Sequence, residues 1–452
     1  MSEGYSTNLV RARSLQAIRA SLVDTVIPDL TKAGAPTSGY LILRLVDYLI
    51  SMDDDAELQP SNAAALKKAM PMIAGGLDGR LSPDLRAFVE TETKKLIARD
   101  PAAAGGVEDL YLGGKKSSAE APVEDEPIGP RLDEKTLTTY LRRRFPDHPE
   151  LTVTGLAFLP GGMSKETIRV YTEEAGRMGG FVIRKDFPIS PSMAGVADEF
   201  PMFEALYAGG RVPLAEPLWQ EPDPSVFGTA LFAVSMVEGS SDISAAVGDA
   251  EQGMIFADAL AKAMARLHAM PLQRTTAGPL IDRDAKGHVI AEIERWYNGL
   301  LEDGATPEPA LATVFAWLMA NVPEQVAPSA IVHGDIGFHN MLMQDGRLTA
   351  LLDWEFAHIG DPAEDLMYSR LFVEQVIDWP SFVQMYVDHG GVAPTPEQER
   401  FFGVWQSARN AAGCARAVNI FLAQPSADIK LAVSGLTFEP RFAIDALQKI
   451  VA

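Results

Sequence analysis

The sequence predicts an α+β fold with two lobes, a small antiparallel β lobe and a large, mainly helical lobe, preceded by a small all-helical bundle. Apolar residues recur at helical spacing throughout residues 1–110. Short apolar strands separated by glycine-containing turns follow within residues 131–240. Residues 241–452 return to helical patterns around a few short strands. The chain therefore predicts three structured parts, in line with its 452 residues.

Residues 1–110 are expected to form an accessory bundle of four helices. The first would place Leu15 and Ile18 on one face, and the fourth would span residues 85–97. No metal-ligand spacing and no catalytic cluster occurs in this part of the sequence, so we expect it to self-associate or to dock another protein. Residues 111–130 are rich in glycine, proline, serine and acidic residues, which predicts a linker.

The composition argues against several classes of partner. The chain carries a net charge of −22, which disfavours nucleic acid and anionic membranes, because both attract positive patches. A single cysteine, Cys414, excludes an internal disulfide and fits a reducing compartment. The sequence shows no signal-peptide core, and no apolar run approaches the roughly 18 residues of a membrane span. We therefore expect a cytoplasmic protein.

One stretch late in the chain carries the strongest functional pattern. It reads H-G-D-x-x-x-x-N from His333 to Asn340 and continues to D-W-E at Asp353. Four fixed positions at this spacing should arise by chance in fewer than about 1% of chains of this length. The pair Asp345-Gly346 predicts a hairpin turn, so that Asn340 opens one arm and Asp353 closes the other. The two oxygen-bearing side chains should therefore converge.

These residue types suit phosphoryl transfer from a nucleotide. Asp335 is the candidate catalytic residue, which would accept or orient the proton of an attacking hydroxyl. Asn340 and Asp353 are candidate ligands of Mg²⁺, a cation that prefers oxygen and keeps several waters. Glu355 would share a strand face with Asp353 and could be an outer or second metal ligand. His333 is expected to brace the loop. Taken singly, each residue could merely cap a turn or end a strand, but the set in register favours function.

The wording HGD…N…DWE…GDPAEDL resembles the aminoglycoside phosphotransferase and choline kinase family of small-molecule kinases. The resemblance covers about residues 131–452. It implies a two-lobed, protein-kinase-like fold, with a nucleotide-binding lobe at 131–240 and a catalytic lobe at 241–452. It also implies ATP or GTP with Mg²⁺ as cofactors and a small-molecule hydroxyl as the acceptor. Asp365, near the end of this wording, is expected to brace the catalytic loop from a helix N-terminus.

The resemblance also places nucleotide contacts before the catalytic loop. A glycine-containing loop between two strands would let backbone N–H groups approach phosphate. Backbone groups of the hinge, from Met236 to Glu238, would bind the base. The candidate nucleotide-binding residues are Gly161, Gly162, Ser164, Val182, Arg184, Glu199, Met236 and Glu238.

The basic residue among these candidates is chosen by register with the protein-kinase strand V-A-I-K. That register selects Arg184, which stands where the kinases have lysine, and leaves Lys185 as the alternative. Glu199 on the next helix is its expected ion-pair partner, with Glu204 second. Pro201 should be tolerated only in the first helical turn, which predicts that Glu199 lies at the helix start.

Three functional hypotheses follow from these patterns. The first is an ATP- or GTP-dependent kinase of a small-molecule alcohol, and the wording is closest to kinase domains related to those fused to acyl-CoA dehydrogenases. That similarity suggests a hydroxyacyl-CoA or another catabolic alcohol as the acceptor. The second hypothesis is an aminoglycoside-type antibiotic phosphotransferase. The third, from another class, is a nucleotide-binding pseudokinase that works through its N-terminal helices. The sequence leaves open the acceptor, the choice between ATP and GTP, and the oligomeric state.

Overall fold

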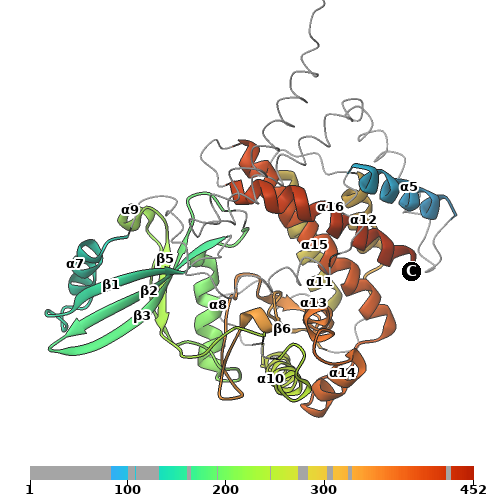
Figure 1. Ribbon diagram of the computed structural model, residues 1–452. Helices are drawn as coiled ribbons and strands as arrows, with labels where there is room; N and C mark the ends of the chain where they lie inside the picture. Colours follow the sequence, from blue (N-terminus) through green and yellow to red (C-terminus); the bar gives the residue numbers. More distant parts are fainter. Residues whose placement is uncertain are drawn as a thin grey trace, which may run out of the picture. The chain divides into compact units, whose positions relative to one another are not determined.

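The computed structural model describes most of the chain from residue 83 onward (Figure 1). Three of the four expected N-terminal helices, the expected linker 111–130, and the loop residues Gly161 and Gly162 lie outside the described residues. The described residues are 83–99, 107, 132–159, 164–190, 192–244, 246–272, 284–302, 309–323, 328–423 and 429–452.

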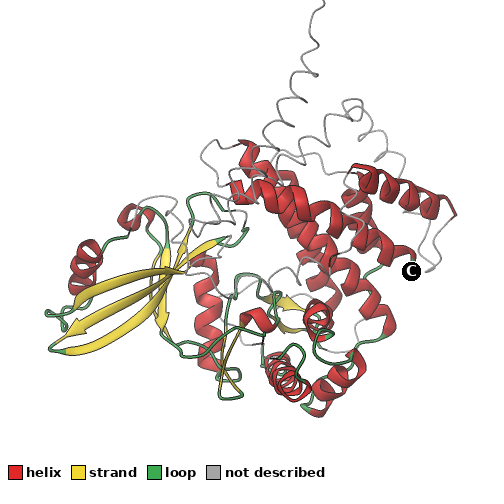
Figure 2. Cartoon of the chain, viewed as in Figure 1, coloured by secondary structure: helices red, strands yellow, loops and turns green. Residues whose placement is uncertain are grey.

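The described chain alternates strands and helices in its first half and is mainly helical in its second (Figure 2). The strands are β1 (Thr152–Leu159), β2 (Lys165–Glu174), β3 (Arg177–Asp186), β4 (Pro217–Glu221), β5 (Leu231–Ser235), β6 (Ala330–Val332), β7 (Met341–Gln344), β8 (Arg347–Leu351) and β9 (His358–Gly360). The helices are α5 (Pro83–Arg99), α7 (Glu134–Arg144), α8 (Val196–Gly209), α9 (Pro224–Phe227), α10 (Ala250–His268), α11 (Ala285–Glu302), α12 (Pro309–Ala320), the 3₁₀ turn η6 (Phe338–Asn340), α13 (Ala363–Val373), α14 (Trp379–Asp388), α15 (Pro396–Ala423) and α16 (Ile429–Val451).

The chain divides into two compact units. One unit consists of Glu124–Val289 and Glu324–Glu399 and holds every strand of the described residues. The described part of the other unit is helical and comprises α5, α12, α16 and the later parts of α11 and α15. The predicted domain boundaries at residues 110, 130 and 240 stay a prediction. The two units are not a test of them, because each unit combines segments that are far apart in the sequence.

An antiparallel sheet in the order β1-β2-β3-β5-β4 forms the centre of the first unit's β lobe. A tight turn at Ala175 and Gly176, both with positive φ, joins β2 to β3. Side chains alternate across the sheet, so Leu231 and Ala233 face one way and Phe232 faces the other. The first face packs against α7 in a closed apolar core. The second face carries the residues that form the candidate site.

Helix α8 lies against the second face and contacts β3, β4 and β5. Phe200 and Phe203 pack on Phe232, with ring centroids 5.4 and 6.1 Å apart. The prediction that Pro201 lies in the first turn is wrong, because α8 begins at Val196 and contains the proline in its interior. The carboxylate of Asp186 accepts a hydrogen bond from the N–H of Val196, the first residue of the helix. Glu199 lies in the first turn, as predicted.

The expected hairpin between the catalytic motif and D-W-E is confirmed. Strands β7 and β8 pair antiparallel, with one register shift after Leu342. Asp345 and Gly346 form its turn with φ values of 49° and 72°, as the residue types predicted. The hairpin is tied to the segment after β5, because Ser240 and Met343 exchange two backbone hydrogen bonds of 2.9 Å.

The second unit is a packed group of helices. The prediction of a helix at 85–97 is confirmed as α5, which contacts α12 and α16. Phe315 of α12 lies 5.3 Å from the ring of Tyr297 and 6.3 Å from that of Trp405. Within the described ranges, no helix has the length and apolar character that a membrane crossing would need.

Candidate active site

A buried carboxylate holds the loop that follows β6. Asp365, at the start of α13, accepts hydrogen bonds of 2.8 Å from the backbone N–H groups of His333 and Gly334. The Nε2 atom of His268 lies 3.0 Å from the same carboxylate, and its Nδ1 lies 2.7 Å from the Tyr386 hydroxyl. Burial alone would raise the pKa of Asp365, but the hydrogen bond and charge of His268 outweigh it and hold that pKa below its ordinary value. The expected bracing role of Asp365 is confirmed.

His333 braces the same loop from the other side. Its Nε2 lies 2.9 Å from the Leu352 carbonyl oxygen, and its Nδ1 lies 3.3 Å from the Asp335 backbone nitrogen. A neutral imidazole protonated on Nε2 satisfies both contacts, since it donates to the carbonyl and accepts from the N–H. The ring also packs on Trp354, with centroids 4.3 Å apart. The imidazole therefore links the loop to the end of β8, in agreement with its expected role.

Asp335 and Asn340 are in direct contact. The Asn340 amide nitrogen donates to the Asp335 backbone oxygen at 2.9 Å and to its Oδ2 at 3.0 Å. These contacts use the nitrogen and leave the amide oxygen available to a cation. Burial raises the pKa of Asp335, but His339, which lies 3.6 Å away, and Tyr368 outweigh burial and lower that pKa below its ordinary value. A carboxylate of low basicity is better suited to orienting a hydroxyl than to removing its proton early.

Asp353 lies where the hairpin returns to Asn340. The Leu352 N–H donates to the Asn340 carbonyl at 2.8 Å, so the two arms close on each other as the sequence predicted. Asp353 has a φ of +63°, a left-handed conformation that non-glycine residues adopt at a cost of about 1–2 kcal/mol. This conformation directs its carboxylate, 30% exposed, into a cavity. Strained backbone that aims a polar group into a cavity is typical of a functional site.

The donor atoms at this point fit Mg²⁺. The Asn340 amide oxygen and the Asp353 carboxylate are hard oxygen donors, and Mg²⁺ needs few protein ligands because it keeps waters and binds phosphate. The described residues contain no group of three or more histidine, cysteine, aspartate or glutamate side chains placed to hold a metal ion. A metal here would therefore rely on two protein oxygens and the nucleotide.

A chain of charges connects Asp353 to the β lobe. The Arg184 Nη2 lies 2.6 Å from Asp353 Oδ1, and its Nε lies 3.7 Å from Glu199 Oε1. The Lys165 ammonium lies 3.0 Å from Glu199 Oε2 and 2.6 Å from Glu355 Oε2. Burial lowers the pKa of Lys165, but these two carboxylates outweigh burial and raise it overall. A buried cation is tolerated here because two carboxylates surround it.

Lys165 is the residue that sequence reasoning missed. It is 2% exposed, starts β2, and pairs more closely with Glu199 than Arg184 does. A signal for it was present: Lys165 shares a strand face with Thr167, which pairs directly with Arg184 across the sheet. The expected Arg184–Glu199 pair exists only as the longer of the two contacts.

Two predicted contacts are engaged with protein groups instead of standing open to a ligand. The Ser164 hydroxyl donates to Glu355 Oε1 at 2.9 Å, and Lys165 binds the other oxygen. Burial and the neighbouring Asp353 charge raise the pKa of Glu355. A metal contact through Glu355 would have to share its oxygens with Ser164 and Lys165.

Arg184 and Lys185, the two candidates for the phosphate contact, lie on opposite faces of β3. Arg184 lines a cavity of about 310 Å³ together with Val182, Glu199 and Asp353. Lys185 lies on the opposite face, 1% exposed and paired in register with Glu166, and burial lowers its pKa. The structure therefore places Arg184, and not Lys185, in the cavity.

The hinge contributes one wall of the same cavity. Met236 and Val237 line it, whereas Glu238 does not. The Glu238 carbonyl instead accepts a hydrogen bond of 2.7 Å from the Thr349 hydroxyl, and its carboxylate lies 3.4 Å from the Gln344 amide. A base bound in this cavity would meet Met236 and Val237, and the expected backbone contact with Glu238 stays a prediction.

The chain is similar in sequence to several known proteins. The model of the phosphotransferase enzyme family matches residues 155–402, more than half of the chain. Acyl-CoA dehydrogenase family member 11 of Gallus gallus is 26% identical over 310 residues, which cover 65% of this chain and 38% of that protein. The chain thus spans less than two fifths of this relative's length. Viomycin phosphotransferase of Streptomyces vinaceus is 52% identical over 42 residues, 8% of this chain and 15% of that protein.

One solved structure supports the fold. A crystal structure assigned as an aminoglycoside phosphotransferase of Ralstonia eutropha superposes with a TM-score of 0.52 at 21% identity. The match covers 71% of this chain and 99% of that one. The predicted two-lobed, kinase-like α+β fold is therefore confirmed for the part that these proteins share.

Proposed function

This chain belongs to the phosphotransferase enzyme family, whose model matches residues 155–402. From that membership we propose that it transfers the γ-phosphoryl group of ATP or GTP, with Mg²⁺, to a hydroxyl group of a small molecule. The observation that carries the proposal is that Asp335, Asn340 and Asp353 come together at the open end of one hairpin, opposite its turn. One carboxylate for the acceptor hydroxyl and two oxygens for a metal are the parts that this transfer requires.

On the acceptor side, Asp335 would hold the attacking hydroxyl in line with the phosphate. Asn340 fixes one of its oxygens by a hydrogen bond of 3.0 Å, so the other oxygen can accept the hydroxyl proton. The lowered pKa of this carboxyl keeps it ionised at neutral pH. Its contribution is therefore orientation and, late in the reaction, acceptance of the proton.

On the nucleotide side, Arg184 would meet the phosphates. It lies beside Asp353 within the cavity, and burial would lower its pKa, but Asp353, Glu199 and Glu355 outweigh burial and raise it, so it stays charged. Lys165 holds Glu199 and Glu355 in place behind it. Bound at Asn340 and Asp353, Mg²⁺ would neutralise phosphate charge.

For the acceptor we propose a hydroxyacyl-CoA or another catabolic alcohol. Several relatives bear the name acyl-CoA dehydrogenase, and a kinase joined to such an enzyme would act on a related acyl-CoA. Three carboxylates next to the catalytic loop are held by protein groups and so do not indicate a polycationic acceptor. Asp361 is bound by the Ala363 N–H and the Gln398 amide, Glu364 lies 3.3 Å from His358, and Asp365 holds the loop.

An antibiotic acceptor is the second candidate. The local identity with viomycin phosphotransferase favours it, although that match covers only 8% of this chain. A cationic antibiotic would need free carboxylates, and the three described above are buried and bound. We therefore rank this candidate below the acyl-CoA alcohols.

The test is a coupled assay of nucleotide consumption across hydroxyacyl-CoAs, simple alcohols, choline-like amines and aminoglycosides. Asp335→Asn serves as the catalytic control. Acceptor-dependent turnover that is lost in this variant would support the proposal and name the acceptor class. Nucleotide binding without turnover across the whole panel would contradict it and favour the pseudokinase hypothesis.

A further inference from the structure

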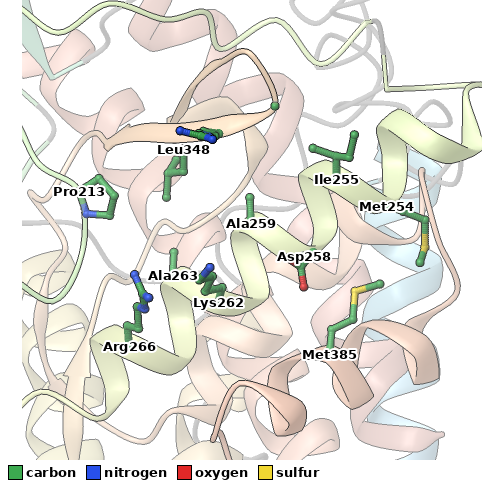
Figure 3. A pocket seen from close by; sticks show the side chains of 12 residues that line it. Pro213, Met254, Ile255, Asp258, Ala259, Lys262, Ala263, Arg266, Leu348 and Met385 are labelled. Atoms are coloured by element: carbon green, nitrogen blue, oxygen red, sulfur yellow. The ribbon is translucent and has the colours of Figure 1, made fainter.

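A second and larger cavity lies along helix α10, away from the nucleotide-binding residues (Figure 3). Its volume is about 640 Å³, and it shares no lining residue with the cavity that contains Arg184. We call it the α10 groove. It is lined by Pro213, Met254, Ile255, Asp258, Ala259, Lys262, Ala263, Arg266, Gly346, Arg347, Leu348 and Met385.

The groove exists because α10 carries small residues on its outer face. Ala259 and Ala263 form the floor, one turn apart, while Leu260 and Met264 on the other face are fully buried in the core. The turn of the β7–β8 hairpin forms one wall, since a Cβ atom added at Gly346 would lie 3.6 Å from the Ile255 side chain. Two alanines in place of larger residues thus leave a trough beside a rigid turn.

The groove concentrates positive charge in an acidic chain. Lys262 and Arg266 lie one helical turn apart, and Arg347 extends from β8. None of these three cations forms a salt bridge with another residue of the described ranges. The one lining carboxylate, Asp258, is already bound, with its Oδ1 2.7 Å from His389 Nε2. A cluster of three available cations in a chain of net charge −22 indicates an anionic ligand.

The shape of the groove favours an extended peptide. The lining face of α10 from Ile255 to Arg266 is about 16 Å long, and Lys262 and Arg266 are exposed to solvent. A small ligand is usually enclosed on most sides, whereas an open trough suits a peptide. Lys262 and Arg266 are about 6 Å apart along the helix, close to the spacing of alternate residues in an extended strand.

The groove also has an apolar end. Figure 3 shows Arg266 at one end and Met254 with Met385 at the other, with Lys262 between them. Met254 is 47% exposed, and methionine side chains adapt readily to an apolar partner. The distance along α10 from Lys262 to Met254 is about 12 Å, which an extended peptide covers in three to four residues.

We propose that the α10 groove binds a short, extended segment of a partner protein that carries two acidic residues separated by one residue, with an apolar residue three to four positions away. The acidic side chains bind Lys262, Arg266 and Arg347, and the apolar side chain lies against Met254, Ile255 and Met385. This site is independent of the proposed kinase reaction, because it shares no residue with it.

The test measures binding to the full chain by fluorescence anisotropy. The labelled probes are the peptide E-S-E-S-S-L-L and its reverse, because the direction of the bound chain is not set by the groove. The comparison probes are K-S-K-S-S-L-L and E-S-E-S-S-S-S. We expect saturable binding of one acidic–apolar peptide, weakened by salt, and at least about fivefold weaker binding of both comparison probes.

Two variants test the charges and the shape of the groove separately. Lys262→Ala with Arg266→Ala should weaken binding about tenfold, and both positions are exposed, so folding should be retained. Ala259→Leu should fill the trough and weaken binding as strongly without any change of charge. Arg177→Ala, which removes an exposed cation outside the groove, should leave binding unchanged.

The proposal is overturned by any of three results. The first is no saturable binding of either acidic–apolar peptide to the unchanged protein. The second is equal binding of the peptide without leucines, which would reduce the groove to a plain anion site. The third is wild-type affinity in both groove variants when their unfolding temperatures match that of the unchanged protein.

Discussion

The catalytic loop and the charge network beside it use similar residues but are assembled in opposite ways. The loop brings together Asp335, Asn340 and Asp353, which lie within 19 consecutive residues and are joined by a single hairpin. The network joins Lys165 to Glu355 across 190 positions of sequence. A local hairpin can be recognised from its turn residues, whereas a contact of this range depends on the packing of separate elements. The comparison therefore distinguishes site contacts that a short sequence motif predicts from site contacts that form only when distant segments pack together.

The largest expected effect tests the local half of this comparison. Asp335→Asn should lower turnover by about 10²–10⁴-fold, because an amide cannot accept the hydroxyl proton. Nucleotide affinity should change little, since Asp335 is not among the residues that line the nucleotide cavity. Both are measured by steady-state kinetics and by nucleotide titration. The matched control is Asp345→Asn at the hairpin turn, and a similar loss of turnover there would contradict the assignment.

The next effect tests the charge network, whose residues are far apart in the sequence. Lys165→Met should destabilise the protein by about 3–5 kcal/mol, because Glu199 and Glu355 would be left buried without their cation. Lys185→Met is the matched control on the neighbouring strand, where burial already lowers the lysine pKa, and it should cost much less. Urea unfolding of both variants measures the difference. Equal losses would show that the Lys165 network has no special role.

A third prediction uses pH to probe the bracing carboxylate. The pKa of Asp365 is held below its ordinary value of 3.8, mainly by His268 against the opposing effect of burial. Its contribution to stability is therefore present above this value and is lost as the pH falls through the lowered folded pKa. Unfolding temperatures between pH 7 and pH 2.5 should fall more steeply below pH 4 in the unchanged protein than in Asp365→Asn.

The variant should also be less stable at neutral pH, because its side chain can no longer accept hydrogen bonds from both His333 and Gly334 as a charged group. Asp345→Asn, at an exposed turn position, should keep the pH profile of the unchanged protein. Parallel profiles for Asp365→Asn and the unchanged protein would show that the buried carboxylate does not contribute to acid unfolding.

The smallest effect concerns the packing of the catalytic loop. Gly337 has an extended backbone, with φ at −169°, that any residue can adopt, but a Cβ there would lie 2.8 Å from the His339 ring and 2.9 Å from Phe372. Gly337→Ala should therefore displace His339 from its stack on Phe372, cost about 1–3 kcal/mol, and lower turnover several-fold.

Gly155→Ala provides the control, because its Cβ would meet only Tyr171 at an ordinary 3.5 Å. Thermal unfolding and initial rates measure both variants. If Gly337→Ala behaved like Gly155→Ala in both measurements, the position of His339 would have no bearing on the loop.

The sequence was informative where contacts are local. Asp345-Gly346 predicted the turn, the turn predicted the approach of Asn340 and Asp353, and the hairpin confirms both. The bracing role of Asp365 is a contact across 32 positions, and it could be predicted because the residue belongs to the motif that carries the family resemblance and lies at a helix N-terminus. Strand alternation put Arg184 and Lys185 on opposite faces, and register with the kinase strand V-A-I-K then favoured Arg184.

Sequence reasoning failed where the place of a residue within an element, or its partner, depends on a distant group. Asp186 caps α8 from the end of β3, so the helix begins at Val196 and Pro201 lies in its interior. A helix in isolation would avoid that proline, but the cap and the packing of Phe200 and Phe203 on the sheet offset its cost.

By itself, the sequence of this protein indicated the family and the kinase-like α+β fold through the resemblance of its motifs. It also determined the local geometry of the phosphotransfer loop, because turn chemistry acts over a few residues. Only the tertiary structure decided that Lys165 binds Glu199 and Glu355, that Glu238 lies outside the cavity, and that α10 carries a basic groove. These features depend on which elements pack together. Burial then makes the pairing of charges important, because an ion without a partner costs free energy in a low-dielectric interior.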